Sequence, residues 1–127
     1  MGKKILLIDD EADFCKITKM NLELISDFSV EFATNAKAGI NLAKRIKPDL
    51  ILLDIRMPGM DGLVTLEKLK SDKDTMEIPV VMLTALDSED YKLKASSLYD
   101  EDYITKPIEA KELKAKIEEV LSRRRII

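Results

Sequence analysis

Five short apolar segments, separated by stretches of helix length, constrain the fold of this 127-residue chain more than any other feature. The segments are Ile5–Ile8, Val30–Ala33, Leu50–Leu53, Val80–Leu83 and Tyr103–Thr105. The first, third and fourth are uninterrupted runs of Ile, Leu, Val and Met, which are typical of strands buried on both faces of a parallel sheet. The second and fifth alternate more, so we expect them at the edges of the sheet.

Between these segments, apolar residues recur three or four positions apart, as on the buried face of an amphipathic helix. The stripes are Phe14, Ile17, Met20 and Leu24; Ile40, Ala43 and Ile46; Leu63, Leu66 and Leu69; and Leu113, Ile117 and Val120. A further helix around Leu93–Leu98 is weaker and more polar. We expect Asn35 and Ser88 to cap helices, and Pro48 and Pro79 to end segments before strands. This strict alternation predicts a doubly wound (βα)5 α/β fold.

The chain contains no histidine, which excludes catalytic triads, HExxH zinc sites and imidazole bases. Its 46% hydrophobic and 35% charged content, with a net charge of −3, is typical of a globular domain. Cys15 is the single cysteine and cannot form an internal disulfide, which favours a reducing compartment. Neither a signal peptide nor an apolar run of membrane length is present, so we expect a soluble, cytoplasmic protein.

Ionisable or hydroxyl side chains directly follow four of the predicted strands. They are Asp9 and Asp10, Asp54, Thr84 and Lys106. Taken singly, each has an ordinary explanation: a turn former, a helix cap or a surface cation. Ligands of doubly wound sheets, however, bind beyond the carboxyl ends of the strands, so the predicted fold brings all five residues to one rim.

Three carboxylates crowded on this rim would repel one another unless a cation compensates them. Oxygen ligands in an incomplete protein shell suit Mg²⁺ better than Zn²⁺. Beside such a cation and a lysine ammonium, an aspartate carboxylate can act as a nucleophile toward a phosphoryl group. Phosphoryl transfer requires mainly positioning and charge neutralisation, which a cation, an ammonium and a hydroxyl supply.

Four motifs occur in order along the chain: LLIDDE at Leu6–Glu11, LLDIRMPGMDG at Leu52–Gly62, MLTA at Met82–Ala85 and DYITKP at Asp102–Pro107. Together they resemble the receiver domain of two-component response regulators, and the resemblance extends over about Lys3–Leu121. It implies a flavodoxin-like sandwich with a five-stranded parallel sheet in strand order 2-1-3-4-5. We therefore expect residues 1–127 to be a single receiver domain, with 122–127 a basic C-terminal end or the start of a linker.

The resemblance also implies roles for the acidic residues. Asp54 would be the phosphoacceptor and would contribute to the magnesium site. Asp10 would bind Mg²⁺ directly and Asp9 mostly through water. The backbone carbonyl of Arg56 would complete the protein ligands.

The remaining motif residues would form the switch, again as the resemblance implies. The Thr84 hydroxyl would move to hydrogen-bond the phosphoryl group, and Lys106 would pair with Asp54 or its phosphate. Tyr103 matches the aromatic residue that turns inward as Thr84 moves. Pro107 would follow a cis peptide bond that directs the Lys106 side chain.

The function that follows is a phosphorylation-activated signalling switch in a two-component phosphorelay. The phosphoryl donor would be a histidine kinase or a histidine phosphotransfer protein, and the missing histidine fits this division of labour. The face formed by the fourth helix, fifth strand and fifth helix would then act on a downstream protein or output domain. A weak homodimer is also compatible with this function. The chain would catalyse only its own phosphoryl transfer and autodephosphorylation. Direct nucleic-acid binding by this domain is not expected, because the C-terminal arginines are more typical of a solvated helix end. Membrane binding is not expected either, because no apolar run approaches the length of a membrane span.

Three alternatives remain open on the sequence. A Mg²⁺-dependent aspartyl-phosphate hydrolase would carry a second Asp two residues after the nucleophile, where this chain has Arg56. A flavin- or nucleotide-binding module would place phosphate at the first strand-to-helix turn, where Asp9, Asp10 and Glu11 would repel it. An unphosphorylated docking module would not need the complete acidic, threonine and lysine set that is present here.

Overall fold

The computed structural model describes residues 2–55, 61–84 and 102–123. The strands are β1 (Lys4–Ile8), β2 (Ser29–Ala33), β3 (Leu50–Asp54), β4 (Val80–Thr84) and β5 (Asp102–Thr105). The helices are α1 (Ala12–Ile25), α2 (Ala36–Ile46), α3 (Gly62–Ser71) and α5 (Ala110–Arg123). The fourth predicted helix and its expected cap Ser88 lie outside the described residues. Among the described residues, no helix combines the length and apolar character that crossing a membrane requires.

The strands form one parallel sheet in the order β2-β1-β3-β4-β5. This confirms the predicted parallel sheet, its strand order and the placement of β2 and β5 at its edges. The register aligns Ile8 of β1 with Leu53 of β3. The residues that follow, Asp9 and Asp54, therefore reach the same edge of the sheet side by side.

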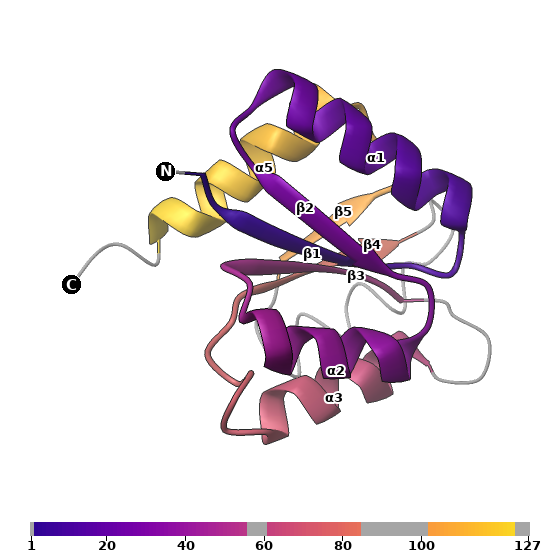
Figure 1. The fold of residues 1–127 in the computed structure, drawn as a ribbon, viewed down its shortest axis with the longest axis vertical. Helices are drawn as coiled ribbons and strands as arrows, with labels where there is room; N and C mark the ends of the chain where they lie inside the picture. Colours follow the sequence, from indigo (N-terminus) through magenta and orange to yellow (C-terminus); the bar gives the residue numbers. More distant parts are fainter. Residues whose placement is uncertain (1, 56–60, 85–101, 124–127) are drawn as a thin grey trace.

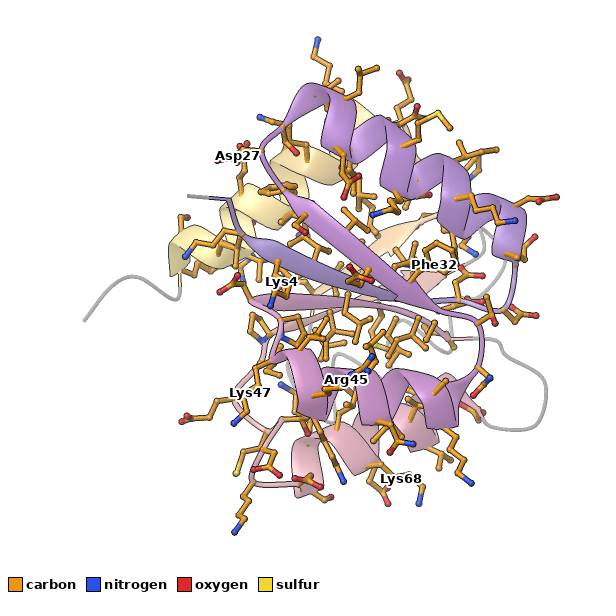
Figure 2. The ribbon with its side chains drawn as sticks, viewed as in Figure 1. Lys4, Asp27, Phe32, Arg45, Lys47 and Lys68 are labelled. Carbon is orange, nitrogen blue, oxygen red and sulfur yellow. The ribbon has the colours of Figure 1, made fainter. Side chains whose placement is uncertain are left out.

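Helices cover both faces of the sheet, α1 and α5 on one side and α2 and α3 on the other (Figure 1). Alternate residues of each central strand point to opposite faces, so β1 contributes Ile5 and Leu7 to the core under α1 and α5, and Leu6 and Ile8 to the core under α2 and α3. The β1, β3 and β4 runs are buried almost completely. Figure 2 shows side chains filling the space on both sides of the sheet. Burial on both faces explains why these strands read as continuous apolar runs.

The buried face of α1 differs from the predicted stripe. Ile17, Met20 and Leu24 are 56%, 65% and 80% exposed. The buried residues of α1 are Cys15, Thr18 and Leu22, and Phe14 is partly buried. The prediction was wrong because apolar residues recur at helical spacing on two faces of this helix. The sheet contacts the face that has the smaller side chains. A short thiol and a hydroxyl allow a close approach that hydropathy alone does not indicate.

The other helices that the structure describes follow the predicted pattern. Leu113, Ile117 and Val120 are the buried residues of α5. In α3, Leu66 and Leu69 are buried and Leu63 is partly buried. At the start of α2, the Asn35 side chain accepts a hydrogen bond from the Ala38 backbone N–H at 2.8 Å, which confirms the predicted cap.

A close approach between α2 and β1 depends on a glycine. A Cβ atom at Gly39 would lie 2.7 Å from the Cδ1 atom of Ile8. Because Ile8 has no exposed surface, it has little room to move away. Gly39 thus lets α2 pack directly onto the strand that leads into Asp9.

The free edge of β2 is occupied by a side-chain pair from α1. Lys19 Nζ donates a hydrogen bond to the Val30 carbonyl at 2.6 Å, and Glu23 Oε2 accepts one from the Val30 backbone N–H at 2.8 Å. Lys19 and Glu23 also form an i,i+4 ion pair at 3.0 Å. Unpaired edge groups are a template for strand addition, so this pair protects the outer edge of the sheet at Val30.

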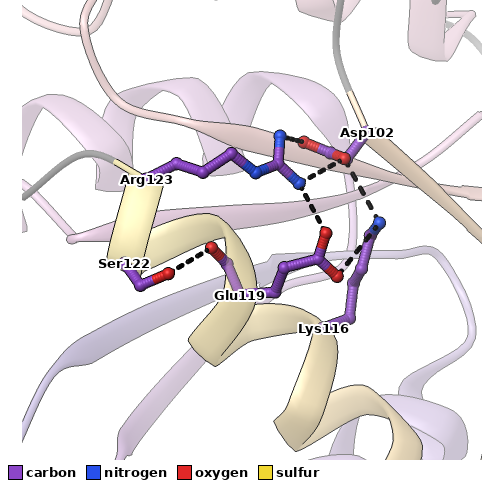
Figure 3. Close-up of polar contacts among 5 residues, drawn as sticks. All are labelled: Asp102, Lys116, Glu119, Ser122 and Arg123. Carbon is purple, nitrogen blue, oxygen red and sulfur yellow. Dashed lines mark hydrogen bonds and ion pairs between the residues drawn. The ribbon is translucent and has the colours of Figure 1, made fainter. Parts of the chain in front are cut away.

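At the opposite edge, an ionic network joins the start of β5 to α5 (Figure 3). The two guanidinium nitrogens of Arg123 donate to the Asp102 carboxylate at 3.1 and 2.9 Å. Lys116 Nζ lies 3.2 Å from the same carboxylate, and Glu119 pairs with Arg123 at 2.9 Å. A bidentate arginine pair has defined geometry, so it ties the first residue of β5 to the last turn of α5.

Candidate functional site

Three carboxylates gather at the carboxyl ends of β1 and β3. Asp9, Asp10 and Asp54 each place one oxygen so that the three oxygens lie within 4.8 Å of one another. Asp9 is fully buried, Asp54 is 7% exposed, and Asp10 is exposed. Oxygen ligands at this spacing, open to solvent on the Asp10 side, fit a hard divalent cation such as Mg²⁺ that keeps part of its water shell.

Lys106 reaches this group from the end of β5. Its Nζ atom lies 2.6 Å from Asp9 Oδ2, 3.3 Å from Glu11 Oε1 and 3.9 Å from Asp54 Oδ2. The expected pair with Asp54 is therefore present, but the shorter contact is a hydrogen bond to Asp9. The backbone N–H of Lys106 donates to the Thr84 carbonyl at 2.7 Å, which brings the ends of β4 and β5 together. The peptide bond between Lys106 and Pro107 is cis, as expected.

The local electrostatics follow from this burial. Burial raises the pKa of Asp9, although the Lys106 hydrogen bond and the Glu11 backbone N–H oppose the change. For Lys106, burial works to lower the pKa, but the hydrogen bond to Asp9 and the charge of Asp54 outweigh it, so the pKa is raised. Lys106 is thus held as a cation against the carboxylates.

Cys15 lies beneath this site. Its thiol donates a hydrogen bond to the Asp9 backbone carbonyl at 3.3 Å, and the side chain is fully buried. Burial and the charge of Asp9 raise the pKa of Cys15 to about 12. The thiolate is the reactive form of cysteine, so Cys15 packs as a small apolar residue at neutral pH.

A cavity of about 380 Å³ connects these groups with Thr84. Its lining includes Asp10, Glu11, Asp54, Thr84 and Lys106. Asp54 and Thr84 are the last residues of their strands, so each strand extends one position beyond the end of its apolar run. The cavity thus gathers a carboxylate, a hydroxyl and an ammonium in a volume that can hold a phosphoryl group.

Of the remaining predicted site residues, Tyr103 lies on β5. Tyr103 pairs in register with Met82 of β4 and is 42% exposed. Arg56, with its expected backbone ligand, falls outside the described residues.

Sequence reasoning missed some residues that shape the site. A Cβ atom at Gly62 would lie 2.5 Å from the carbonyl oxygen of Asp54 and from backbone atoms of Ile55, so glycine alone lets α3 start against the rim. The Asp61 side chain caps α3 by accepting from the Leu63 N–H at 2.7 Å. A Gly preceded by Asp at the start of an apolar helical pattern was the available signal for both. No contact with Lys106 was predicted for Glu11, because this contact depends on the tertiary fold.

Comparison with known proteins agrees with this arrangement. The sequence profile of the family described as "Response regulator receiver domain" matches residues 5–118. The chain belongs to this family of phosphorelay signalling domains from two-component systems. It is 40% identical over 123 residues to the phosphate regulon transcriptional regulatory protein PhoB of Pseudomonas aeruginosa, covering 97% of this chain and 53% of that protein.

A second relative and a solved structure support the same assignment. The alkaline phosphatase synthesis transcriptional regulatory protein PhoP of Bacillus subtilis is 36% identical over 126 residues, covering 99% of this chain and 51% of that protein. The chain thus spans about half the length of these curated relatives. The receiver domain of the Francisella response regulator 1452 superposes with a TM-score of 0.85 at 28% identity, covering 98% of this chain and 100% of that domain.

Proposed function

We propose that this chain is a phosphorylation-activated switch that accepts a phosphoryl group on Asp54. The observation that carries the proposal is the position of the Asp54 carboxylate. One of its oxygens lies with those of Asp9 and Asp10 within 4.8 Å, and Lys106 Nζ is 3.9 Å away. Asp54 also lines the same cavity as Thr84. A nucleophile, a cation site, an ammonium and a hydroxyl donor are the groups that phosphoryl transfer requires.

We propose a phosphohistidine of a histidine kinase or phosphotransfer protein as the donor, since this chain contains no histidine. An oxygen of the Asp54 carboxylate forms the new bond to phosphorus. The bond between phosphorus and the donor imidazole nitrogen breaks, and its electron pair returns to the imidazole. The product is an acyl phosphate on this chain and an unmodified histidine on the donor.

The carboxylates of Asp9, Asp10 and Asp54 would hold Mg²⁺, with the Arg56 carbonyl as a further proposed ligand. When bound, the metal ion would neutralise charge on the transferring group. Lys106 places a second positive charge 3.9 Å from Asp54 and would move the short distance from Asp9 to a phosphoryl oxygen. Lys106 would thus pair with Asp9 in the unphosphorylated, metal-free protein and with the phosphoryl group in the phosphorylated protein. Asp9 would then pair with Mg²⁺ in place of Lys106.

The phosphoryl group adds negative charge and three acceptor oxygens, so nearby donors reorganise toward it. Thr84 contributes a hydroxyl group to the cavity. A shift of its side chain would open space for Tyr103, which is exposed on the neighbouring strand β5. This change would alter the face that includes β5 and α5. We propose that this face acts on an output segment or partner protein, as the names of the two transcriptional regulators suggest.

Intact-protein mass spectrometry tests the assignment. Incubation with Mg²⁺ and acetyl phosphate should add the mass of one phosphoryl group, through a bond that survives acid but not base. Asp54→Asn should abolish the addition, while the matched control Asp27→Asn, in the turn between α1 and β2, should not change it. Incorporation at the wild-type level in Asp54→Asn would refute the proposal. Turnover of an added phosphomonoester would instead favour the aspartyl-phosphate hydrolase.

A further inference from the structure

An aromatic ring from α1 contacts the lysine of the site. The ammonium of Lys106 lies 4.3 Å from the centroid of the Phe14 ring. Phe14 is in the first turns of α1 and packs against the core beneath α1 and α5. The Phe14 ring thus packs against the core, and its face contacts the Lys106 ammonium. A cation over an aromatic face at this distance is attracted by the ring quadrupole.

Two kinds of contact hold Lys106, and they respond differently to a bound metal ion. The carboxylate contacts are to Asp9 at 2.6 Å, Glu11 at 3.3 Å and Asp54 at 3.9 Å. Asp9 and Asp54 belong to the group that would hold a divalent cation, so their attraction for Lys106 falls when their charge is neutralised. The Phe14 ring is not a metal ligand, and its contact with the ammonium does not depend on those charges.

Lys106 lies between two cavities, so the contacts that hold its side chain decide which cavity its ammonium faces. Lys106 lines the cavity that contains Asp54 and also a more apolar groove of about 470 Å³ between α1 and the start of α5, lined by Phe14, Ile17 and Leu113 among others. A lysine side chain has many rotamers, so it needs a contact that selects the one facing Asp54. Phe14 borders the groove and supplies that contact.

We propose that Phe14 is a positioning residue for phosphoryl transfer. Its ring keeps the Lys106 ammonium facing Asp54 when the acidic residues are occupied by a metal ion. This inference rests on the proposed function of Asp54. The aromatic face is the property that matters, because an aliphatic side chain of similar bulk keeps the apolar contact but lacks the quadrupole.

The first test is structural and uses the metal-free protein. NMR should show the Lys106 ε-methylene protons shifted upfield by the Phe14 ring current, relative to the exposed Lys111. The shift should disappear in Phe14→Leu and remain in Phe14→Tyr, while the matched control Phe32→Leu, on the edge strand β2, should retain it. Wild-type Lys106 resonances that coincide with those of Lys111 would overturn the placement without any variant.

The second test measures the rate of phosphorylation at saturating Mg²⁺. Acetyl phosphate is the donor, so that no protein partner contacts the groove between α1 and α5. Phe14→Leu should react roughly five- to tenfold more slowly, which corresponds to the loss of one partly desolvated cation–π contact. Phe14→Tyr should restore the rate to within about twofold, and the concentration of Mg²⁺ needed for half saturation should not change in either variant.

The outcomes separate the two proposals. A wild-type rate in Phe14→Leu, or a Phe14→Tyr rate as slow as that of Phe14→Leu, would overturn the positioning role. If the wild-type protein is not phosphorylated on Asp54, the proposed function fails, and the functional role of Phe14 fails with it. The ring-current measurement would still report whether Phe14 holds Lys106.

Discussion

Lys106 Nζ donates a 2.6 Å hydrogen bond to Asp9 Oδ2, across 97 positions of sequence. The acceptor is fully buried and the lysine side chain is 17% exposed. The contact joins the ends of β1 and β5, which are not neighbours in the sheet. It also compensates a buried carboxylate at the position where a metal ion would do so.

Removing the Lys106 charge should destabilise the metal-free protein. Lys106→Met leaves the buried Asp9 carboxylate without its short hydrogen bond, at a cost of about 2 kcal/mol in the free energy of unfolding. Addition of Mg²⁺ should recover most of this loss, because the cation then compensates the same carboxylates. Urea denaturation with and without Mg²⁺ measures both effects. The control Lys111→Met, exposed on α5, should behave as wild type, and a Lys106→Met protein as stable as wild type without metal would contradict the prediction.

Two leucines on α1 should respond very differently to truncation. Leu22 has no exposed surface, whereas Leu24 is 80% exposed. Leu22→Ala should lower the free energy of unfolding by about 2–5 kcal/mol because it leaves a cavity between α1 and the sheet. Leu24→Ala should change it by less than about 0.5 kcal/mol. Denaturation curves of the two variants measure the difference, and equal losses would show that α1 packs through the other face.

The Glu23 carboxylate should protect the Val30 amide from hydrogen exchange. Glu23→Ala removes the acceptor of the Val30 N–H at the free edge of β2, so exchange at this amide should become roughly tenfold faster. The exposed edge should also promote self-association at high protein concentration. Amide exchange followed by NMR and light scattering measure the two effects. Glu118→Ala, which removes a comparable i,i+4 pair with Lys114 on α5, is the control and should change neither.

The Asp102 network should make stability depend on acid pH. Burial alone would raise the pKa of Asp102, but hydrogen bonds from Arg123 and Lys116 outweigh it and lower the pKa below its ordinary value of 3.8. A lowered pKa in the folded state means that this stabilisation is complete above the unfolded pKa and is lost as the pH falls through the folded one. Asp102→Asn should therefore lower the free energy of unfolding at neutral pH, by less than about 1 kcal/mol because water screens the pair.

The difference between wild type and Asp102→Asn should shrink as the pH falls past 3.8 and vanish below the lowered pKa. Urea denaturation across this range measures it, with Asp27→Asn as the control for loss of one acidic side chain. A difference that stays constant down to the lowest pH would show that the charge of Asp102 is not responsible.

Much of this protein could be predicted from local patterns. The central strands β1, β3 and β4 are buried on both faces, so each must be a continuous apolar run, and such runs are visible in any single sequence. The alternation of strands and helices then brings the strand ends to one rim. Asp9, Asp54 and Thr84 lie there as predicted, because the residue at the end of a strand is placed by the strand itself.

Contacts between side chains from distant elements could not be predicted in the same way. The alternation of strands and helices was enough to predict that Lys106 and the acidic residues share a rim. The packing of distant elements determines that the shortest ion-pair contact of Lys106 is with Asp9 and that Glu11 and Phe14 also contact its ammonium. It also selected Cys15, Thr18 and Leu22 as the buried face of α1. The physical reason is that periodicity reports which faces of an element are apolar, whereas the packing distance between elements decides which face is buried and which charges meet.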